Sequence, residues 1–280
     1  MLNISNVKFT VLGSAGFIGR NLVASLESLG ALVYAPTRDG DELFSQIFRN
    51  DLGHVIYCIG LTADFRHRPF ETVDAHVCFL RKVLERGCFE SLTYLSSTRV
   101  YEGASTTLET GVLQGAPGNP EQLYNFSKLM GESLCLNCGR RAKVVRLSNV
   151  YGPGMGKENF LSLVLSEAAS TGRVHFLTSP ESSKDFISVK EVVRFLPSIA
   201  MDGQQAIYNL ASGLNTTNAE IASALRKEGI TVTFSALSPE WVFPVIDIKR
   251  LESEFIVSTR RLEIDFPDLL NYFRSKVVCE

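Results

Sequence analysis

The start of this chain combines an apolar run, a glycine-rich turn and a helical pattern. The apolar run is Lys8–Leu12, which is typical of a buried strand. Gly13, Gly16 and Gly19 then open a segment in which apolar residues recur at helical spacing as far as Leu29. A strand that leads through a tight turn into a helix is the first half of a βαβ unit, so we expect an α/β fold with a parallel sheet.

The glycine turn is also a candidate binding site for a dinucleotide. Gly13 permits the tight turn, Gly16 lets the backbone approach a pyrophosphate, and Gly19 allows close packing of helix on strand. The helix N-terminus adds free N–H groups and a partial positive charge. The spacing is GxxGxxG instead of GxGxxG, so a merely structural turn remains an alternative. The expected cofactor contacts here are Gly13, Ala15, Gly16, Phe17, Ile18 and Gly19.

Strand-like and helix-like segments alternate through the first half of the chain, as in a Rossmann doubly wound sheet. Predicted strands are Lys8–Leu12, Ala31–Ala35, His54–Ile59, Ser91–Ser96 and Lys143–Leu147, and predicted helices are Gly16–Leu29, Phe70–Arg86, Tyr124–Cys138 and Glu158–Ser170. The alternation becomes irregular after about residue 150. We therefore expect a Rossmann domain over 1–150 with about 185–212, and a small substrate-binding lobe over about 151–184 and 213–280.

Composition excludes several classes of function. The net charge is −2 with no basic stripe, which argues against nucleic acid as a partner. No apolar run is long enough to span a bilayer, and the N-terminus lacks a signal pattern, so we expect a cytoplasmic protein without membrane association. Six cysteines lie scattered in apolar contexts. Cys135 and Cys138 form a CxxC, but without a second pair we expect core residues and no metal site.

The residues after the second predicted strand should meet the adenosine ribose of a bound dinucleotide. An acidic residue there would bind the 2′-hydroxyl of NAD, whereas this chain has Thr37 followed by Arg38. A hydroxyl and a guanidinium suit a 2′-phosphate, so NADP is favoured as the cofactor and NAD is the alternative. In that alternative, Arg38 is a solvated loop residue and Asp39 binds the ribose.

Three side chains are candidates for proton chemistry. Tyr124 and Lys128 are four residues apart and share one face of the predicted helix. An ammonium and a positive nicotinamide ring both favour the phenolate, so such a tyrosine can act as an acid or base near neutrality. The strand around Leu95 ends in hydroxyl residues, which can deliver a third polar group to the same cleft.

The motifs together resemble the extended short-chain dehydrogenases/reductases, the family of nucleotide-sugar epimerases, dehydratases and 4-ketoreductases. The resemblance runs from about residue 7 to residue 225. It implies a Rossmann domain, a small C-terminal lobe and commonly a homodimer formed through helices that include the one carrying Tyr124. It rests on Gly13-x-x-Gly16-x-x-Gly19, Ser96-Ser97-x-x-Val100-Tyr101, Tyr124-x-x-x-Lys128, Arg146-x-x-Asn149, Asp185-Phe-Ile-x-Val189 and Tyr208-Asn-Leu-Ala-Ser-Gly213.

The resemblance also implies roles for single residues. Tyr124 would be the acid/base, Lys128 would hold the nicotinamide ribose and lower the tyrosine pKa, and Ser97 would bind the sugar hydroxyl or ketone. Ile59 and Gly60 would lie close to the cofactor. The candidate substrate contacts are Ser97, Thr98, Asn149, Asn159 and Lys184, although we favour strand-end capping for Thr98 and its neighbour Ser96.

Departures from the family pattern bear on the reaction. Dehydratases carry Asp-Glu where this chain has Thr98-Arg99, which disfavours a dehydratase. His76 replaces the usual asparagine, and we favour a hydrogen-bonded structural histidine over a proton relay. Lys184 stands where family members have an arginine for the diphosphate, and Glu240-Trp241 replaces a second basic residue. Another small carbonyl compound is therefore an alternative to a nucleotide-sugar as the substrate.

The sequence therefore predicts an NADP-dependent reductase of a keto group on a nucleotide-linked 4-keto(-6-deoxy) sugar. One alternative is a nucleotide-sugar 4-epimerase with tightly bound NAD, because it would use the same residues. An alternative from another class is a non-catalytic protein that senses the cofactor or serves as a scaffold, because fold alone does not fix function.

Overall fold

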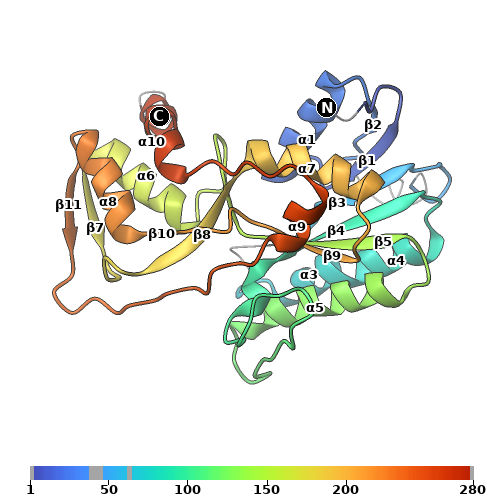
Figure 1. Ribbon diagram of the computed structural model, residues 1–280, viewed down its shortest axis with the longest axis horizontal. Coiled ribbons are helices and arrows are strands. Elements are labelled where there is room, and N and C mark those ends of the chain that lie inside the picture. Colours follow the sequence, from blue (N-terminus) through green and yellow to red (C-terminus); the bar gives the residue numbers. More distant parts are fainter. Residues whose placement is uncertain (1–2, 38–46, 62–64, 278–280) are drawn as a thin grey trace.

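The central element is a parallel sheet with the strand order β2-β1-β3-β4-β5-β9 (Figure 1). The computed structural model describes residues 3–37, 47–61 and 65–277, and within these ranges the sheet has six strands. Apolar side chains fill both faces of its middle strands, as parallel sheets require. The strands are β1 (Lys8–Leu12), β2 (Leu32–Tyr34), β3 (His54–Tyr57), β4 (Ser91–Ser97), β5 (Ala142–Leu147) and β9 (Ile207–Leu210).

Helices cover both faces of this sheet (Figure 1). On one face, α1 (Phe17–Ser28) and α7 (Val189–Asp202) share a core with β1 and β5. On the other, α4 (Phe79–Arg86) and α5 (Gln122–Asn137) pack on β3 and β4. The predicted helix 70–86 is realised as three consecutive pieces. These are α3 (Pro69–Val73), the π-helical η1 (Asp74–Cys78) and α4.

The strand order reverses between β1 and β3, because the chain runs outward from β1 to β2 and then returns to the other side of β1. In open parallel sheets, ligands bind in the crevice outside the carboxyl ends of the strands at such a reversal. The glycine turn after β1 and the loop after β3 meet there. The predicted α/β fold of the Rossmann type is thus confirmed.

A second group of elements forms the lobe at the left of Figure 1. Two small sheets pair β10 with β8 and β6, and β11 with β7. An apolar core joins them to three helices. The elements are β6 (Asn149–Tyr151), β7 (Arg173–Phe176), β8 (Ser183–Ser188), β10 (Asn215–Thr217), β11 (Thr231–Phe234), α6 (Phe160–Thr171), α8 (Asn218–Lys227) and α10 (Leu262–Val277). The exact division of the chain into two domains stays a prediction.

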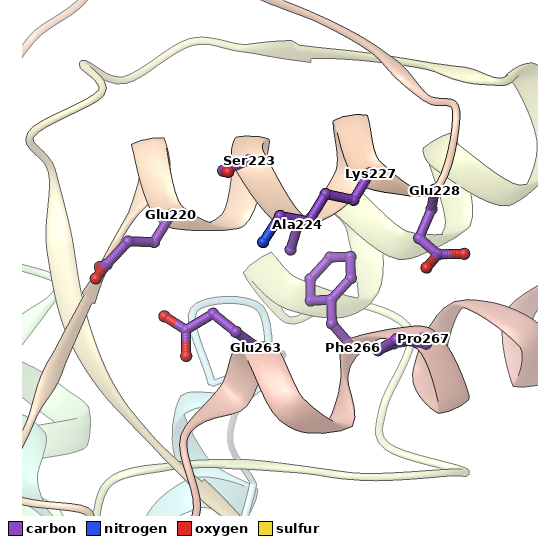
Figure 2. Close-up of a pocket in the computed structure, with 8 residues that line it drawn as sticks. All are labelled: Glu220, Ser223, Ala224, Lys227, Glu228, Glu263, Phe266 and Pro267. Atoms are coloured by element: carbon purple, nitrogen blue, oxygen red, sulfur yellow. The ribbon is translucent and has the colours of Figure 1, made fainter.

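A shallow pocket of about 230 Å³ lies between α8 and α10 (Figure 2). Ala224 and Phe266 form its apolar floor, and Glu220, Lys227 and Glu263 stand around it. All of these residues belong to the lobe, away from the helix that carries Tyr124. Within the described ranges, no helix is long and apolar enough to cross a membrane, and no cluster of His, Cys, Asp or Glu side chains could hold a metal ion.

Candidate functional site

The glycine turn has the geometry of a dinucleotide cradle. Gly13 adopts a φ of +88°, and a Cβ there would lie 2.9 Å from the carbonyl carbon of Cys58 in the loop after β3. A Cβ on Gly19 would overlap the carbonyl oxygen of Gly13, so helix and turn pack as closely as predicted. Gly16 caps α1 in an extended conformation, and the first turn of that helix contains no acidic residue. An anionic pyrophosphate fits this cradle.

The turn is tied to the segment that follows β2. The Ser14 hydroxyl donates to the carbonyl oxygen of Pro36 over 3.3 Å, which brings Thr37 towards the cradle. Arg38 and Asp39 lie outside the described residues, so the structure does not decide between a 2′-phosphate and a 2′-hydroxyl.

Lys128 reaches from α5 to the carboxyl ends of two strands. Its Nζ donates to the carbonyl oxygen of Leu95 in β4 over 2.9 Å. A Cβ on Gly60, in the loop after β3, would lie 3.3 Å from the same nitrogen. Burial lowers the pKa of Lys128 to about 7, and the carboxylate of Glu132 opposes this shift. The lysine therefore lies where the predicted cofactor contacts Ile59 and Gly60 border α5.

Tyr124 and Ser97 meet at the end of β4. The side chain of Tyr124 is only 6% exposed, and this burial raises its pKa. The hydrogen bond with Ser97 and the positive charge of Arg99 both lower it. Ser97 is the last residue of β4 and the N-cap of the 3-10 helix η2 (Thr98–Tyr101), where its Oγ accepts from the backbone N–H of Arg99 over 3.2 Å.

The capping interpretation of the neighbouring hydroxyls needs a correction. The strand-end cap is Ser97, and the hydroxyl of Ser96 instead donates to the buried carboxylate of Glu132. The reason is the alternation of a strand, which turns adjacent side chains to opposite faces. Thr98 is buried at the start of η2, 4% exposed, and its role as a substrate contact stays a prediction.

His76 acts as a structural link between α5 and the loop after β3. Its Nε2 accepts from the backbone N–H of Leu61 over 3.2 Å, and its Nδ1 lies 2.8 Å from the hydroxyl of Ser127. The Ser127 hydroxyl in turn donates to the carbonyl oxygen of Tyr124, so Nδ1 carries the proton of the neutral ring. Burial, reinforced by Lys128, lowers the His76 pKa to about 2. This geometry agrees with the hydrogen-bonded structural histidine favoured from the sequence.

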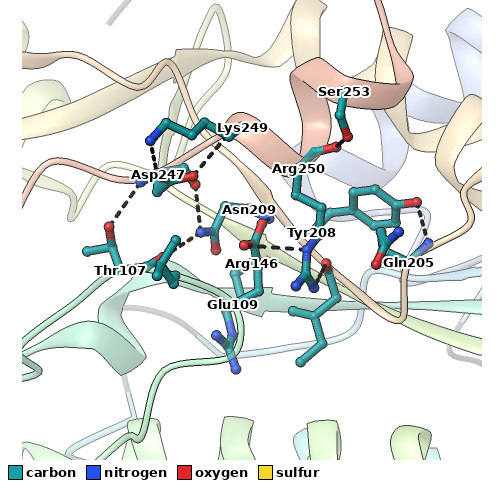
Figure 3. A network of polar contacts seen from close by, with 12 residues as sticks. Thr107, Glu109, Arg146, Gln205, Tyr208, Asn209, Asp247, Lys249, Arg250 and Ser253 are labelled. Atoms are coloured by element: carbon teal, nitrogen blue, oxygen red, sulfur yellow. Dashed lines mark hydrogen bonds and ion pairs between the residues drawn. The ribbon is translucent and has the colours of Figure 1, made fainter.

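A buried polar network lies behind α5. Glu132 of α5 pairs with Arg146 of β5 over 2.6 Å, and Arg146 donates to the hydroxyl of Tyr101 over 2.7 Å. That hydroxyl donates to the side chain of Asn209, which itself donates to the carbonyl oxygen of Asp247 (Figure 3). The network fixes α5, η2 and the C-terminal segment relative to one another.

Sequence reasoning missed this network, although one signal was available. Glu132 follows Lys128 by four residues and Tyr124 by eight, so it lies on the same helix face. A carboxylate on a buried face requires a cation nearby.

Lys184 is held in the lobe by aromatic rings. Its Nζ lies 4.1 Å from the centre of the Phe160 ring and 5.5 Å from that of Trp241. Burial lowers the pKa of Lys184 to about 8, with no charged neighbour contributing to the shift. Lys184 is half-buried, and an ammonium in such surroundings can pair with an anion.

The two predicted asparagine contacts differ in their local roles. Asn149 of β6 is exposed, and its side-chain amide donates to the carbonyl oxygen of Asp185 in β8 over 2.8 Å. Asn159 is the N-cap of α6, where its Oδ1 accepts from the backbone N–H of Ser162 and its Nδ2 donates to the carbonyl oxygen of Gly156. Local structure thus already occupies both polar groups of Asn159, and a substrate contact by either residue stays a prediction.

A pocket of about 520 Å³ opens beside the C-terminal end of the buried network. Thr107 and Asp247 line it together with the turn that follows β9. Tyr124 does not line this pocket, and its ring packs against Phe65 and Arg99.

Known proteins match this chain over most of its length. A family model described as the NAD dependent epimerase/dehydratase family matches residues 9–211. The dTDP-4-dehydro-6-deoxyglucose reductase of Escherichia coli is 25% identical over 233 residues, which covers 76% of this chain and 72% of that protein. The GDP-6-deoxy-D-mannose reductase of Pseudomonas aeruginosa is 28% identical over 230 residues, covering 72% and 74% respectively.

The fold is also that of a solved structure, MoeE5 in complex with UDP-glucose and NAD. The TM-score is 0.79 at 22% identity, covering 96% of this chain and 99% of MoeE5. The family match spans the cradle, the Ser97, Tyr124 and Lys128 cluster and the strands that carry them. The chain therefore belongs to the NAD dependent epimerase/dehydratase family, within the extended short-chain dehydrogenases/reductases, and is an NAD(P)-dependent oxidoreductase or epimerase.

Proposed function

We propose that the protein is an NADP-dependent reductase of a nucleotide-linked 4-keto(-6-deoxy) sugar. The observation that carries the proposal is the position of Ser97 and the buried Tyr124 at the end of β4, next to the ammonium of Lys128 and the glycine cradle. Both curated relatives described above are named as reductases of deoxy-sugar nucleotides, which supports this substrate class.

The proton chemistry follows from the surroundings of Tyr124. A bound nicotinamide dinucleotide supplies the hydride in a reaction of this class. Tyr124 gives its proton to the carbonyl oxygen of the substrate, and the Ser97 hydroxyl donates a hydrogen bond to the same oxygen. Burial excludes water and keeps the phenol protonated until the substrate oxygen becomes basic. Lys128, whose Nζ lies beside Gly60, would hold the ribose of the nicotinamide.

Thr37 and Arg38 motivate the choice of NADP, and the cofactor itself is the first test. Mass spectrometry of the small molecules released from the freshly purified, denatured protein would identify it. An empty site or partial NADP occupancy agrees with a reductase that exchanges its cofactor in each turnover. Stoichiometric NAD would contradict the proposal. NADPH oxidation with nucleotide-linked 4-keto-6-deoxy sugars is then the direct assay.

A nucleotide-sugar 4-epimerase is the second candidate, since it would use the same three side chains. The likeness of fold to MoeE5, whose structure holds UDP-glucose and NAD, is the observation that favours it. A dehydratase is disfavoured because Thr98 and Arg99 occupy the positions of its two carboxylates. Cofactor binding without turnover of any sugar nucleotide would instead favour the non-catalytic sensor or scaffold.

We also propose that the protein forms a homodimer through α5 and its neighbour α3. Two apolar side chains on these elements are exposed, Phe70 at 81% and Met130 at 54%. Analytical ultracentrifugation tests this proposal, and a monomer at micromolar concentration would contradict it.

A further inference from the structure

The guanidinium of Arg99 lies against the ring of Tyr124. Arg99 is the second residue of η2, and its Cζ is 5.7 Å from the centre of the Tyr124 ring. The same carbon is 5.1 Å from the centre of the Phe65 ring, and the two rings are 5.5 Å apart. Two aromatic rings therefore hold this cation at the proposed acid/base, a contact that electrostatic attraction to the ring faces stabilises.

Arg99 is also tied to both elements that carry the reacting hydroxyls. Its backbone N–H donates to the Oγ of Ser97 over 3.2 Å. Its Nη2 pairs over 3.0 Å with Glu121, the residue that immediately precedes α5. Arg66 binds the same carboxylate from the other side. The guanidinium is thereby fixed in place, although 30% of its side chain is exposed.

Lys128 is a second cation at a similar distance from Tyr124. Its Nζ lies 5.8 Å from the centre of the Tyr124 ring and donates to the carbonyl oxygen of Leu95. Because burial lowers the pKa of Lys128 to about 7, this lysine is only partly charged at neutral pH. A guanidinium stays charged throughout the working range.

We propose that Arg99 is a positioning residue whose fixed positive charge sets how readily Tyr124 releases its proton. This inference rests on the proposed function, in which Tyr124 is the acid/base. Dehydratases carry a carboxylate at the position of Arg99. This chain therefore has the opposite charge beside the tyrosine.

Arg99 acts on Tyr124 together with the other charges around the ring. The positive charge of Arg99 lowers the Tyr124 pKa against the effect of burial. Glu121 stays ionised, because its hydrogen bonds to Arg66 and Arg99 hold its pKa at about 2. The ionisable groups near Tyr124 are His76 from η1, Tyr94 from β4, Arg99 and Glu102 from the η2 segment, Arg66 from the loop before α3, and Glu121 and Lys128 from the α5 segment.

The test compares the ionisation of Tyr124 in Arg99→Gln, Arg99→Lys and Arg66→Gln. Arg66→Gln is the matched control, since it removes the other partner of Glu121 but leaves Arg99 against the tyrosine ring. The midpoint is read from the ¹³C signal of ring-labelled Tyr124 in the protein with NADP⁺, assigned with Tyr124→Phe. The alkaline limb of the pH profile for ketone reduction is a second readout, because reduction requires the protonated phenol.

We expect Arg99→Gln to raise the midpoint by about one pH unit, since removing a nearby cation disfavours the phenolate. Arg99→Lys keeps the positive charge, so its midpoint should stay close to that of the wild type. Arg66→Gln should change the midpoint little. An equal midpoint in the wild type and Arg99→Gln, an equal shift in Arg66→Gln, or no ionisation of Tyr124 in any variant up to pH 11 would overturn the proposal. Failure of the proposed function is distinct, since it appears as absent turnover in the wild type and leaves the NMR titration readable.

Discussion

Two lysines with lowered pKa values, the buried Lys128 of α5 and the half-buried Lys184 of the lobe, have different neighbours. Lys128 donates to a main-chain carbonyl and lies near Glu132, whereas Lys184 has the rings of Phe160 and Trp241. Burial lowers both pKa values, to about 7 and about 8 respectively. The ammonium of Lys128 thus has a hydrogen-bond acceptor within the chain, while the ammonium of Lys184 lies against aromatic rings.

The two lysines differ in how the surrounding chain holds them. Around Lys128, hydrogen bonds link α5 to β4, through His76 to the loop after β3 and, through Glu132, to β5. Around Lys184, the partners are aromatic rings that favour a cation without neutralising it. Under the proposed function, proton transfer takes place beside Lys128, and the lobe contacts the substrate through Lys184.

The largest expected effect comes from removing Tyr124, the proposed acid/base beside Lys128. Tyr124→Phe should lower turnover about a thousandfold, because general acid catalysis contributes on this order. Cofactor affinity and thermal stability should stay near wild type. Tyr272→Phe, in α10 of the lobe, is the matched control and should retain full activity. Stopped-flow NADPH oxidation checks the prediction, and full turnover by Tyr124→Phe would contradict it.

The next largest effect is on the free energy of unfolding, and it comes from the buried ion pair between Glu132 and Arg146. Glu132→Gln should lower the free energy of unfolding by about 3 kcal/mol, because it leaves the buried guanidinium of Arg146 without its anion. Glu85→Gln removes an exposed ion pair with Arg81 and should change stability by about 0.5 kcal/mol or less. Urea titration measures both, and equal losses would show that burial of the pair does not matter.

The lobe lysine should affect substrate binding and leave the chemical step intact. Lys184→Met should raise KM for a nucleotide sugar about tenfold at unchanged kcat, as loss of one charge-assisted hydrogen bond implies. Lys184→Arg keeps the charge and should stay within about threefold of wild type. Steady-state kinetics with both variants decide the matter. A fall in kcat at constant KM would place Lys184 outside the binding role.

The lowered pKa of Lys184 gives this prediction a dependence on pH. The ammonium loses its proton as the pH rises through about 8, where an ordinary lysine stays charged. Substrate affinity should therefore weaken between pH 7 and 9 in the wild type. The affinity of Lys184→Arg should stay constant over that range, because arginine does not titrate there. Identical profiles, measured by isothermal titration calorimetry, would refute the assignment.

The smallest effect separates capping from substrate binding at Asn159. Asn159→Ala should lower the free energy of unfolding by about 1 kcal/mol through loss of the α6 cap, while KM stays constant. Asn159→Ser preserves a capping hydroxyl and should keep most of the stability. A raised KM without a stability loss would instead favour the substrate contact that the sequence predicts.

Local patterns predicted the elements because strand and helix periodicities are properties of neighbouring residues. The run Lys8–Leu12 is the observed β1, and the four-residue spacing brings Tyr124 and Lys128 to one buried face. Contacts between distant residues escaped prediction. The pairing of Glu132 with Arg146, and the packing of Trp241 near Lys184, require the register of separate elements. Nothing in the local sequence around Arg99 indicates that its guanidinium lies against Tyr124.

The most direct test of the proposed reduction follows a labelled hydride. NADPH deuterated at the transferred position of the nicotinamide is incubated with the protein and a nucleotide-linked 4-keto-6-deoxy sugar, and the product is analysed by mass spectrometry. The account predicts one deuterium bound to the new carbinol carbon for each NADP⁺ formed. An epimerised sugar nucleotide without deuterium, formed with no net loss of NADPH, would contradict it.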